Sequence, residues 1–181
     1  MLIDLTPSTV ANSRCDYLAL CCDLPVILMP SFYTEIEIDA PRSIVWKALL
    51  DKQNWKIWNS FLFDRAPTLP FEVGRSLLLS QRRKIREPET TFEVQVIRLQ
   101  SEYSLCWVCE APGYRSEHHF DLVDIGRGHT KYAHSEKISG QLSWLFTPFI
   151  RRDEQAGMRR MALELKQYSE YQIANPNLKS R

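Results

Sequence analysis

Five strand-like segments follow one another in the second half of this 181-residue chain, and only short turn sequences separate them. Turn-forming residues occupy the breaks at Glu87-Pro88, Pro112-Gly113 and Gly126-Arg127-Gly128. Parallel strands need longer crossover connections, so this spacing predicts an antiparallel meander. The five predicted strands cover residues 74–84, 91–99, 103–110, 116–124 and 130–140.

Other elements are predicted on both sides of the meander. Alternating apolar and polar residues from Ser31 to Asp39 predict a further strand. Pro41 suits a first helical turn, and helical spacing after it predicts a short helix ending near Asp51 and a second one over 54–59. Thr147-Pro148 matches an N-cap followed by a proline at the first helical position. A long amphipathic helix is therefore predicted from about Phe149 to Tyr171.

This order of elements predicts an α+β fold. We expect a curved antiparallel sheet of about six or seven strands wrapped around the long C-terminal helix, with the two short helices after the first strand. One helix rarely fills the concave side of such a sheet, so a cavity between sheet and helix is expected.

Composition narrows the class of protein. The chain is 44% hydrophobic with a formal net charge of +1, which predicts one globular domain, excludes disorder for the body of the chain and gives no electrostatic reason to bind nucleic acid. No uninterrupted apolar run of about 18 residues is present, so no transmembrane helix is predicted. The odd number and irregular spacing of the cysteines favour free thiols in the cytoplasm: Cys15, Cys21, Cys22, Cys106 and Cys109.

Residues 1–30 differ in composition from the rest. They are interpreted as an N-terminal extension, partly disordered or packed on the domain, which itself covers 31–173 and precedes a tail at 174–181. Asp23 and Pro25 interrupt the apolar patch of the extension, so it is not interpreted as a signal peptide.

Strand phase provides the clearest site prediction. Asp121, Lys131 and Lys137 belong in water, so the even-numbered positions of the last two predicted strands should face inward. If the hairpin closes around 125–129, His118 faces Glu136, Phe120 faces His134 and Leu122 faces Tyr132. Three titratable side chains then line an apolar concavity: His118, His134 and Glu136.

The chemistry of these three residues stays open at this stage. A buried His–Glu pair suits proton transfer such as enolisation or dehydration, and the same groups also suit orienting a bound ligand or a purely structural role. As metal ligands, two histidines and one carboxylate are a common chance set. Cys106 and Cys109 lie three apart on a predicted strand and point to opposite faces, so they do not bind a metal or form a disulfide together. No metal site and no cofactor are therefore predicted.

Two segments resemble a known family. "IDAPRSIVWKALLDKQNWKIWN" (38–59) is similar to the strand–helix–helix opening of the SRPBCC, or START-like, superfamily, and "HHFDLVDIGRGHTKYAHSEKISG" (118–140) is similar to its His-x-Phe-x-Leu, Gly-x-Thr and His-x-Glu run. The resemblance covers about Phe32 to Tyr171. It implies a helix-grip fold with a deep hydrophobic cavity, in a superfamily that includes lipid-transfer proteins, polyketide cyclases and dehydratases, and co-chaperones.

The resemblance and the residue patterns together predict a binding protein. We expect a carrier or sensor that holds a lipid, an isoprenoid or an aromatic polyketide-like molecule, with no nucleic-acid partner and at most transient membrane contact. The first alternative is a cofactor-independent cyclase or dehydratase that uses His118, His134 and Glu136, and the second is a co-chaperone-like interaction module. The predicted ligand contacts are Trp58, Phe61, Phe92, Val94, Phe120, Leu122, Tyr132, Gly157, Met161 and Leu165.

Two further segments each have two interpretations. Leu142 to Phe149 carries Trp144, Leu145 and Phe146, and is interpreted either as a hydrophobic lid or membrane contact or as the seat of the long helix. The basic run 81–86 is interpreted by default as a solvated strand end and turn, with phosphate or headgroup contact as the alternative.

Overall fold

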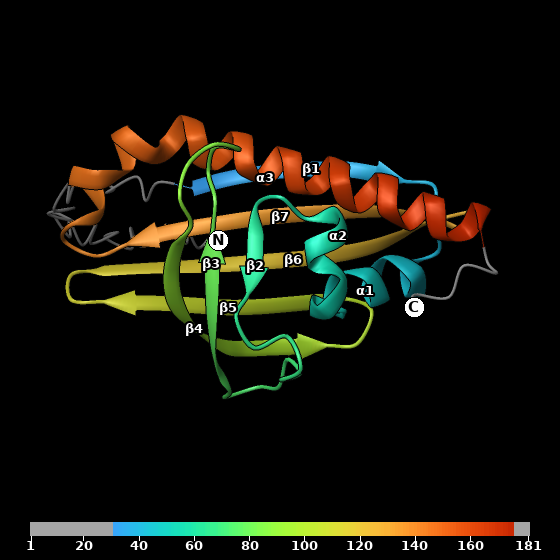
Figure 1. The fold of residues 1–181 in the computed structure, drawn as a ribbon, viewed down its shortest axis with the longest axis horizontal. Coiled ribbons are helices and arrows are strands. Elements are labelled where there is room, and N and C mark those ends of the chain that lie inside the picture. The colour runs from blue at the N-terminus through green and yellow to red at the C-terminus, as the bar shows by residue number, and fades with distance from the viewer. Residues whose placement is uncertain (1–30, 176–181) are drawn as a thin grey trace, which may run out of the picture.

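A computed structural model describes residues 31–175. One curled sheet contains all of the described strands, in the order β1-β7-β6-β5-β4-β3-β2, and every neighbouring pair is antiparallel. The long helix α3 runs along one face of this sheet beside β1 and β7 (Figure 1). The elements are β1 (Ser31–Ile38), α1 (Arg42–Leu50), the 3₁₀ turn η1 (Lys52–Asn54), α2 (Trp55–Trp58), β2 (Leu62–Asp64), β3 (Ser76–Gln81), β4 (Thr90–Gln100), β5 (Ser104–Ala111), β6 (Tyr114–Gly126), β7 (His129–Ser139) and α3 (Ser143–Ala174).

The predicted α+β helix-grip architecture is confirmed. The five-strand meander corresponds to β3 through β7, and the strand before it to β1. The seventh strand, β2, was not located from the sequence because three residues are too few to show an alternating pattern. Pairing with β3 makes it a strand, with Leu62 opposite Gln81.

The predicted start of the long helix was wrong. The helix begins at Ser143, whose backbone N–H and hydroxyl both donate to the carbonyl of Gly140, at 3.1 and 2.7 Å. Pro148 therefore lies inside the helix, where it removes one backbone donor. Thr147 does not cap the helix, because its hydroxyl donates back to the carbonyl of Ser143 at 2.5 Å.

An aromatic core fills the middle of the concave interior. We use this name for Trp55, Phe71, Trp107 and Phe120, all of which are buried. The rings of Phe71 and Trp107 stack at 5.7 Å, and Phe120 lies 4.4 Å from Trp107 between ring centroids. Burying a side chain of this size contributes roughly 1.5–3 kcal/mol, so this core is a main source of stability.

The long helix closes the interior through one close approach. A Cβ at Gly157 would lie 2.2 Å from the ring of Phe61, so the absence of a side chain lets that ring pack directly against the helix backbone. Further along α3, the rings of Trp58 and Tyr168 stack at 5.8 Å. These contacts join α2 and the residue just before β2 to the helix, and Figure 1 shows α2 lying beside α3.

Candidate functional site

A cavity of about 320 Å³ opens at one end of the concave interior. This volume is at the small end of the range for ligand pockets, which is about 300–1,000 Å³. Its walls come from strands β3 to β7, from the loop after β3 and from the first part of α3. The lining residues are Gln81, Arg83, Thr90, Phe92, Cys109, Tyr114, Ser116, His118, Glu136 and Ile150. We call this space the polar cavity.

The strand phase and register predicted from the sequence are confirmed. Strands β6 and β7 pair with His118 opposite Glu136, Phe120 opposite His134 and Leu122 opposite Tyr132. The even-numbered side chains are buried from Ser116 to Leu122 on β6 and from Thr130 to Ile138 on β7, while Lys137, at an odd-numbered position of β7, is exposed. The three predicted titratable residues therefore lie together inside the fold.

The polar side chains form a continuous row from the aromatic core to the polar cavity. Nε2 of His134 lies 3.2 Å from Nδ1 of His118, and Nε2 of His118 lies 3.4 Å from Oε1 of Glu136. The same carboxylate oxygen accepts a hydrogen bond of 2.6 Å from the hydroxyl of Ser116. When each ring is protonated on Nε2, His134 donates a hydrogen bond to His118, and the N–H of His118 lies on the side of Glu136 in a longer electrostatic contact.

Glu136 ends this row at the cavity wall. Its second carboxylate oxygen, Oε2, is buried and has no hydrogen-bond partner among the described residues. A buried acceptor without a partner carries a desolvation cost of about 1–3 kcal/mol. Among the described residues that line the cavity, this oxygen is the buried side-chain atom that lacks a partner.

Burial dominates the titration of the row. Loss of solvent raises the pKa of Glu136 to about 7, although the Ser116 hydrogen bond and the charge of Arg83 oppose this shift. The same effect lowers the pKa of His118 to about 4 and holds the pKa of His134 well below its usual value. At neutral pH both histidines are uncharged, and the carboxyl of Glu136 is present in both its protonated and its ionised form.

A second carboxylate lies beside the cavity. Glu154 of α3 is buried, accepts a hydrogen bond of 2.7 Å from Nε of Arg83, and accepts another from the side-chain amide of Gln81. Burial and the charge of Glu136 raise its pKa. In the sequence, Glu154 comes four residues after Ile150 and seven before Met161, which is helical spacing for one apolar stripe, and a carboxylate in such a stripe is the signal that points to a buried polar role.

The default interpretation of the basic run 81–86 was wrong for two of its residues. Gln81 is buried and Arg83 pairs with Glu154, and both line the cavity. The reason is that the end of β3 turns toward α3, which brings a buried carboxylate within reach of this segment. Lys84 and Arg86 are exposed, as predicted.

The predicted ligand contacts separate into two groups. Phe92 lines the polar cavity. The other side chains pack within the continuous hydrophobic core, and Gly157 lies against Phe61. Their role as ligand contacts stays a prediction. The core residues are Trp58, Phe61, Val94, Phe120, Leu122, Tyr132, Met161 and Leu165.

The structure describes two of the five cysteines, Cys106 and Cys109. Cys106 and Cys109 point to opposite faces of β5 as predicted, because Cys109 lines the cavity while Cys106 contacts Glu117 and His119 on the other face. The other three cysteines belong to 1–30, outside the described residues.

The lid segment forms the first turns of α3. Leu142 and Leu145 are 43% and 44% exposed, and Phe149 is 81% exposed. The side chains of Trp144 and Phe146 lie outside the described part of the structure. A lid or membrane role stays a prediction. In the described part of the chain, the helices are too short or too polar to span a bilayer.

Comparison with solved structures gives the class of fold. The chain is similar to a START superfamily protein from Mycobacterium smegmatis, with TM-score 0.60 and 14% identity over 78% of this chain and 97% of that one. It is also similar to the Zhui aromatase/cyclase from a Streptomyces species, with TM-score 0.59 and 10% identity over 82% and 98%. It spans about half, 47%, of a protein of the dynemicin biosynthetic locus, at TM-score 0.58, 17% identity and 77% coverage of this chain.

These similarities establish the fold that the sequence resemblance implied. The chain has a helix-grip fold, which it shares with the START superfamily protein and the aromatase/cyclase. No family model and no curated protein matches the sequence. At identities this low the fold alone is shared, so function has to be argued from the site.

Proposed function

We propose that this protein binds a small hydrophobic molecule that carries a carbonyl or hydroxyl group. The apolar part of the molecule would contact Phe92 and Ile150, and its polar group would reach Glu136. The observation that carries this proposal is the buried, unpartnered Oε2 of Glu136 in the wall of a 320 Å³ cavity. A ligand hydroxyl that donates to this atom, or a ligand carbonyl that accepts from the protonated carboxyl, would remove its desolvation cost.

The size of the cavity narrows the ligand class. A volume at the small end of ligand pockets favours a molecule of one or two rings over a full-length diacyl lipid. Apolar burial would supply most of the affinity, at roughly 25 cal/mol per Å² before the entropy losses of binding. The polar row would set the orientation of the ligand.

The buried carboxyl also favours a second candidate function, a cofactor-independent cyclase or dehydratase. A group with a pKa of about 7 both accepts and donates a proton at neutral pH. In this version, Oε2 of Glu136 would take a proton from a carbon next to a carbonyl and return it to a hydroxyl leaving group as water departs. Ser116 would hold Oε1 as a hydrogen-bond donor throughout, with His118 in electrostatic contact with the same oxygen.

Native mass spectrometry of the full chain, with organic extraction of any bound molecule, tests the proposal. We expect one hydrophobic passenger per chain, or else saturable binding of an anilinonaphthalene sulfonate probe. The Glu136→Gln variant separates the two candidate functions. If the protein is a carrier, the substitution should change the affinity for the passenger and nothing else. If it is an enzyme, the substitution should abolish turnover of the passenger's precursor. A chain that carries no passenger and ignores the probe would contradict both.

A matched pair of variants locates the binding site. Thr90 lines the cavity from an exposed position, and its neighbour Thr91 is exposed on the same strand without lining it. We expect Thr90→Trp to block the cavity and weaken probe binding at least about tenfold, which is about 1.4 kcal/mol. Thr91→Trp should bind the probe normally. Equal effects of both substitutions would place the binding site elsewhere.

A further inference from the structure

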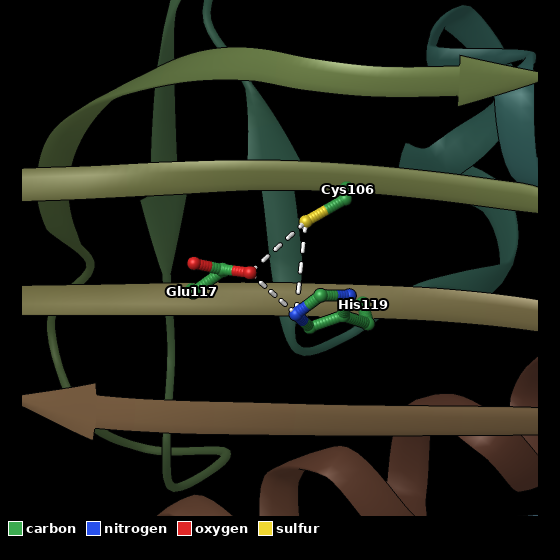
Figure 2. Close-up of side chains that lie close together, drawn as sticks. All are labelled: Cys106, Glu117 and His119. Carbon is green, nitrogen blue, oxygen red and sulfur yellow. Dashed lines mark hydrogen bonds and ion pairs between the residues drawn. The ribbon is translucent and has the colours of Figure 1, made fainter.

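A second group of chemically reactive side chains lies on the face of the sheet opposite to the polar cavity. It consists of Cys106 on β5 with Glu117 and His119 on β6, and Figure 2 shows the three side chains pointing toward one another. Cys106 and His119 are directly opposite each other in the strand pairing. Glu117 lies two residues before His119, so it shares the same face of the sheet. The backbone ladder thus positions all three.

The two distances from Sγ of Cys106 are close to those of a metal centre, and the third contact in the group is shorter. Sγ of Cys106 lies 3.8 Å from Nε2 of His119 and 3.9 Å from Oε1 of Glu117, and these last two atoms are 2.7 Å apart. Around a tetrahedral Zn²⁺, bond lengths of about 2.3 Å to sulfur and 2.0–2.2 Å to nitrogen or oxygen place the ligand atoms roughly 3.3–3.6 Å apart. The two contacts of Sγ need to shorten by a few tenths of an ångström, while the contact between His119 and Glu117 needs to lengthen by about 0.6–0.7 Å.

We propose that Cys106, Glu117 and His119 bind a zinc ion. A thiolate, an imidazole and a carboxylate are the ligands that zinc prefers, and a water would occupy the fourth position. On binding, the thiol proton of Cys106 leaves to solvent, and the proton on Nε2 of His119 moves by exchange with solvent to Nδ1. The contact between His119 and Glu117 is then replaced by two bonds to the ion. Neither oxidation nor reduction is involved.

Neighbouring side chains support this geometry. Arg115 contacts Oε2 of Glu117 at 3.2 Å, which leaves Oε1 directed at the other two ligands. Cys106 is fully buried, while Glu117 and His119 are only partly buried, so an ion can enter from the solvent side and keep a water. Arg98 lies opposite Cys106 on β4, and its exposed side chain is free to turn toward solvent.

The zinc centre would link two strands in the middle of the sheet. It would join β5 to β6 beside the ladder hydrogen bonds, and two of its ligands flank His118 in the sequence. The proposed ligand cavity lies on the other face of the sheet, so the zinc site does not depend on the proposed function.

Metal titration of the full chain tests this site. We expect the chelator-treated protein to bind one equivalent of Zn²⁺ in competition with a chromophoric chelator. With Co²⁺, it should show the intense visible bands of a tetrahedral site and a thiolate-to-cobalt charge-transfer band in the near ultraviolet. Absence of stoichiometric Zn²⁺ binding would overturn the proposal.

Single substitutions assign the ligands. Cys106→Ser should abolish the charge-transfer band. His119→Gln should weaken Zn²⁺ binding by more than the roughly 10–100-fold that is lost when a residue that only orients a ligand is replaced. Cys109→Ser is the matched control, since Cys109 points to the other face of the same strand. The band must survive in that variant. Retention of the band in Cys106→Ser would overturn the proposal, because other thiols of the chain would then hold the metal.

Folding of each variant is checked by far-ultraviolet circular dichroism. If Cys106→Ser does not fold, Glu117→Gln and His119→Gln take its place, because both of these side chains are partly exposed. Each folded variant should bind Zn²⁺ less tightly than the unmodified chain. Unchanged affinity in both would overturn the assignment.

Discussion

The aromatic core and the polar cavity occupy neighbouring parts of one concave interior, but only the first is packed with side chains. In the aromatic core, stacked rings fill the space between sheet and helices, and Gly157 lets the helix backbone approach Phe61. In the polar cavity, the wall instead carries a buried carboxyl with an oxygen that lacks a partner. The core thus stabilises the fold, while the cavity accepts a stability cost that a ligand can remove.

Truncation within the aromatic core should have the largest effect. We expect Phe120→Ala to lower the free energy of unfolding by about 3–5 kcal/mol, because the removed ring packs against both Trp107 and His134. Denaturant unfolding measures this loss. Phe149→Ala is the control at an 81% exposed position and should change stability by less than about 0.5 kcal/mol. Similar losses of stability in both variants would contradict the conclusion that the aromatic core is a main source of stability.

The polar cavity should produce a pH dependence of stability. The pKa of Glu136 rises from 4.5 to about 7 on folding, so its contribution to stability is fully present below pH 4.5 and is lost as pH rises through 7. We expect this loss to total about 3 kcal/mol. Denaturant unfolding from pH 4 to pH 8 measures it.

Glu136→Gln supplies the control for this pH dependence. Glu154 and Arg83 lie near the same carboxyl and remain in the variant, so the difference between the two stability curves isolates Glu136. If the two curves ran parallel from pH 4 to pH 8, the carboxyl would not be desolvated in the folded chain.

Gly157→Ala should have an intermediate effect. The added methyl group would clash with the ring of Phe61, and we expect a loss of about 1–3 kcal/mol in the free energy of unfolding. Phe61→Leu in the same chain should recover part of this loss, which thermal unfolding of the double variant would show. Full stability of the single variant would mean that the helix and the ring are not in close contact.

The smallest effect should come from Ser116. Ser116→Ala removes the hydrogen bond to Glu136 and should cost about 0.5–1.5 kcal/mol at pH 8, where the carboxylate is charged. Because this bond lowers the pKa of Glu136, its loss should move the pH-dependent decrease in stability to higher pH. A shift to lower pH would contradict the assigned contact.

The local patterns of the sequence predicted the fold more fully than they predicted the site. Alternation along β6 and β7 was sufficient to pair His118 with Glu136, because a period of two decides which side chains face inward. The sequence did not place Arg83 and Gln81 beside Glu154, since these residues lie about seventy positions apart and meet only when α3 crosses the end of β3. The group formed by Cys106, Glu117 and His119 was missed because Cys106 was weighed only with Cys109.

By itself, the sequence determined the order of elements, the antiparallel meander and the inward direction of His118, His134 and Glu136. These properties depend on spacing along the chain, which turn residues and hydrophobic periodicity report directly. The tertiary structure alone decided how much of the interior stays empty. Trp107 and Phe120 fill its middle and leave a cavity of about 320 Å³ at one end, because packing depends on side chains that long-range contacts bring together.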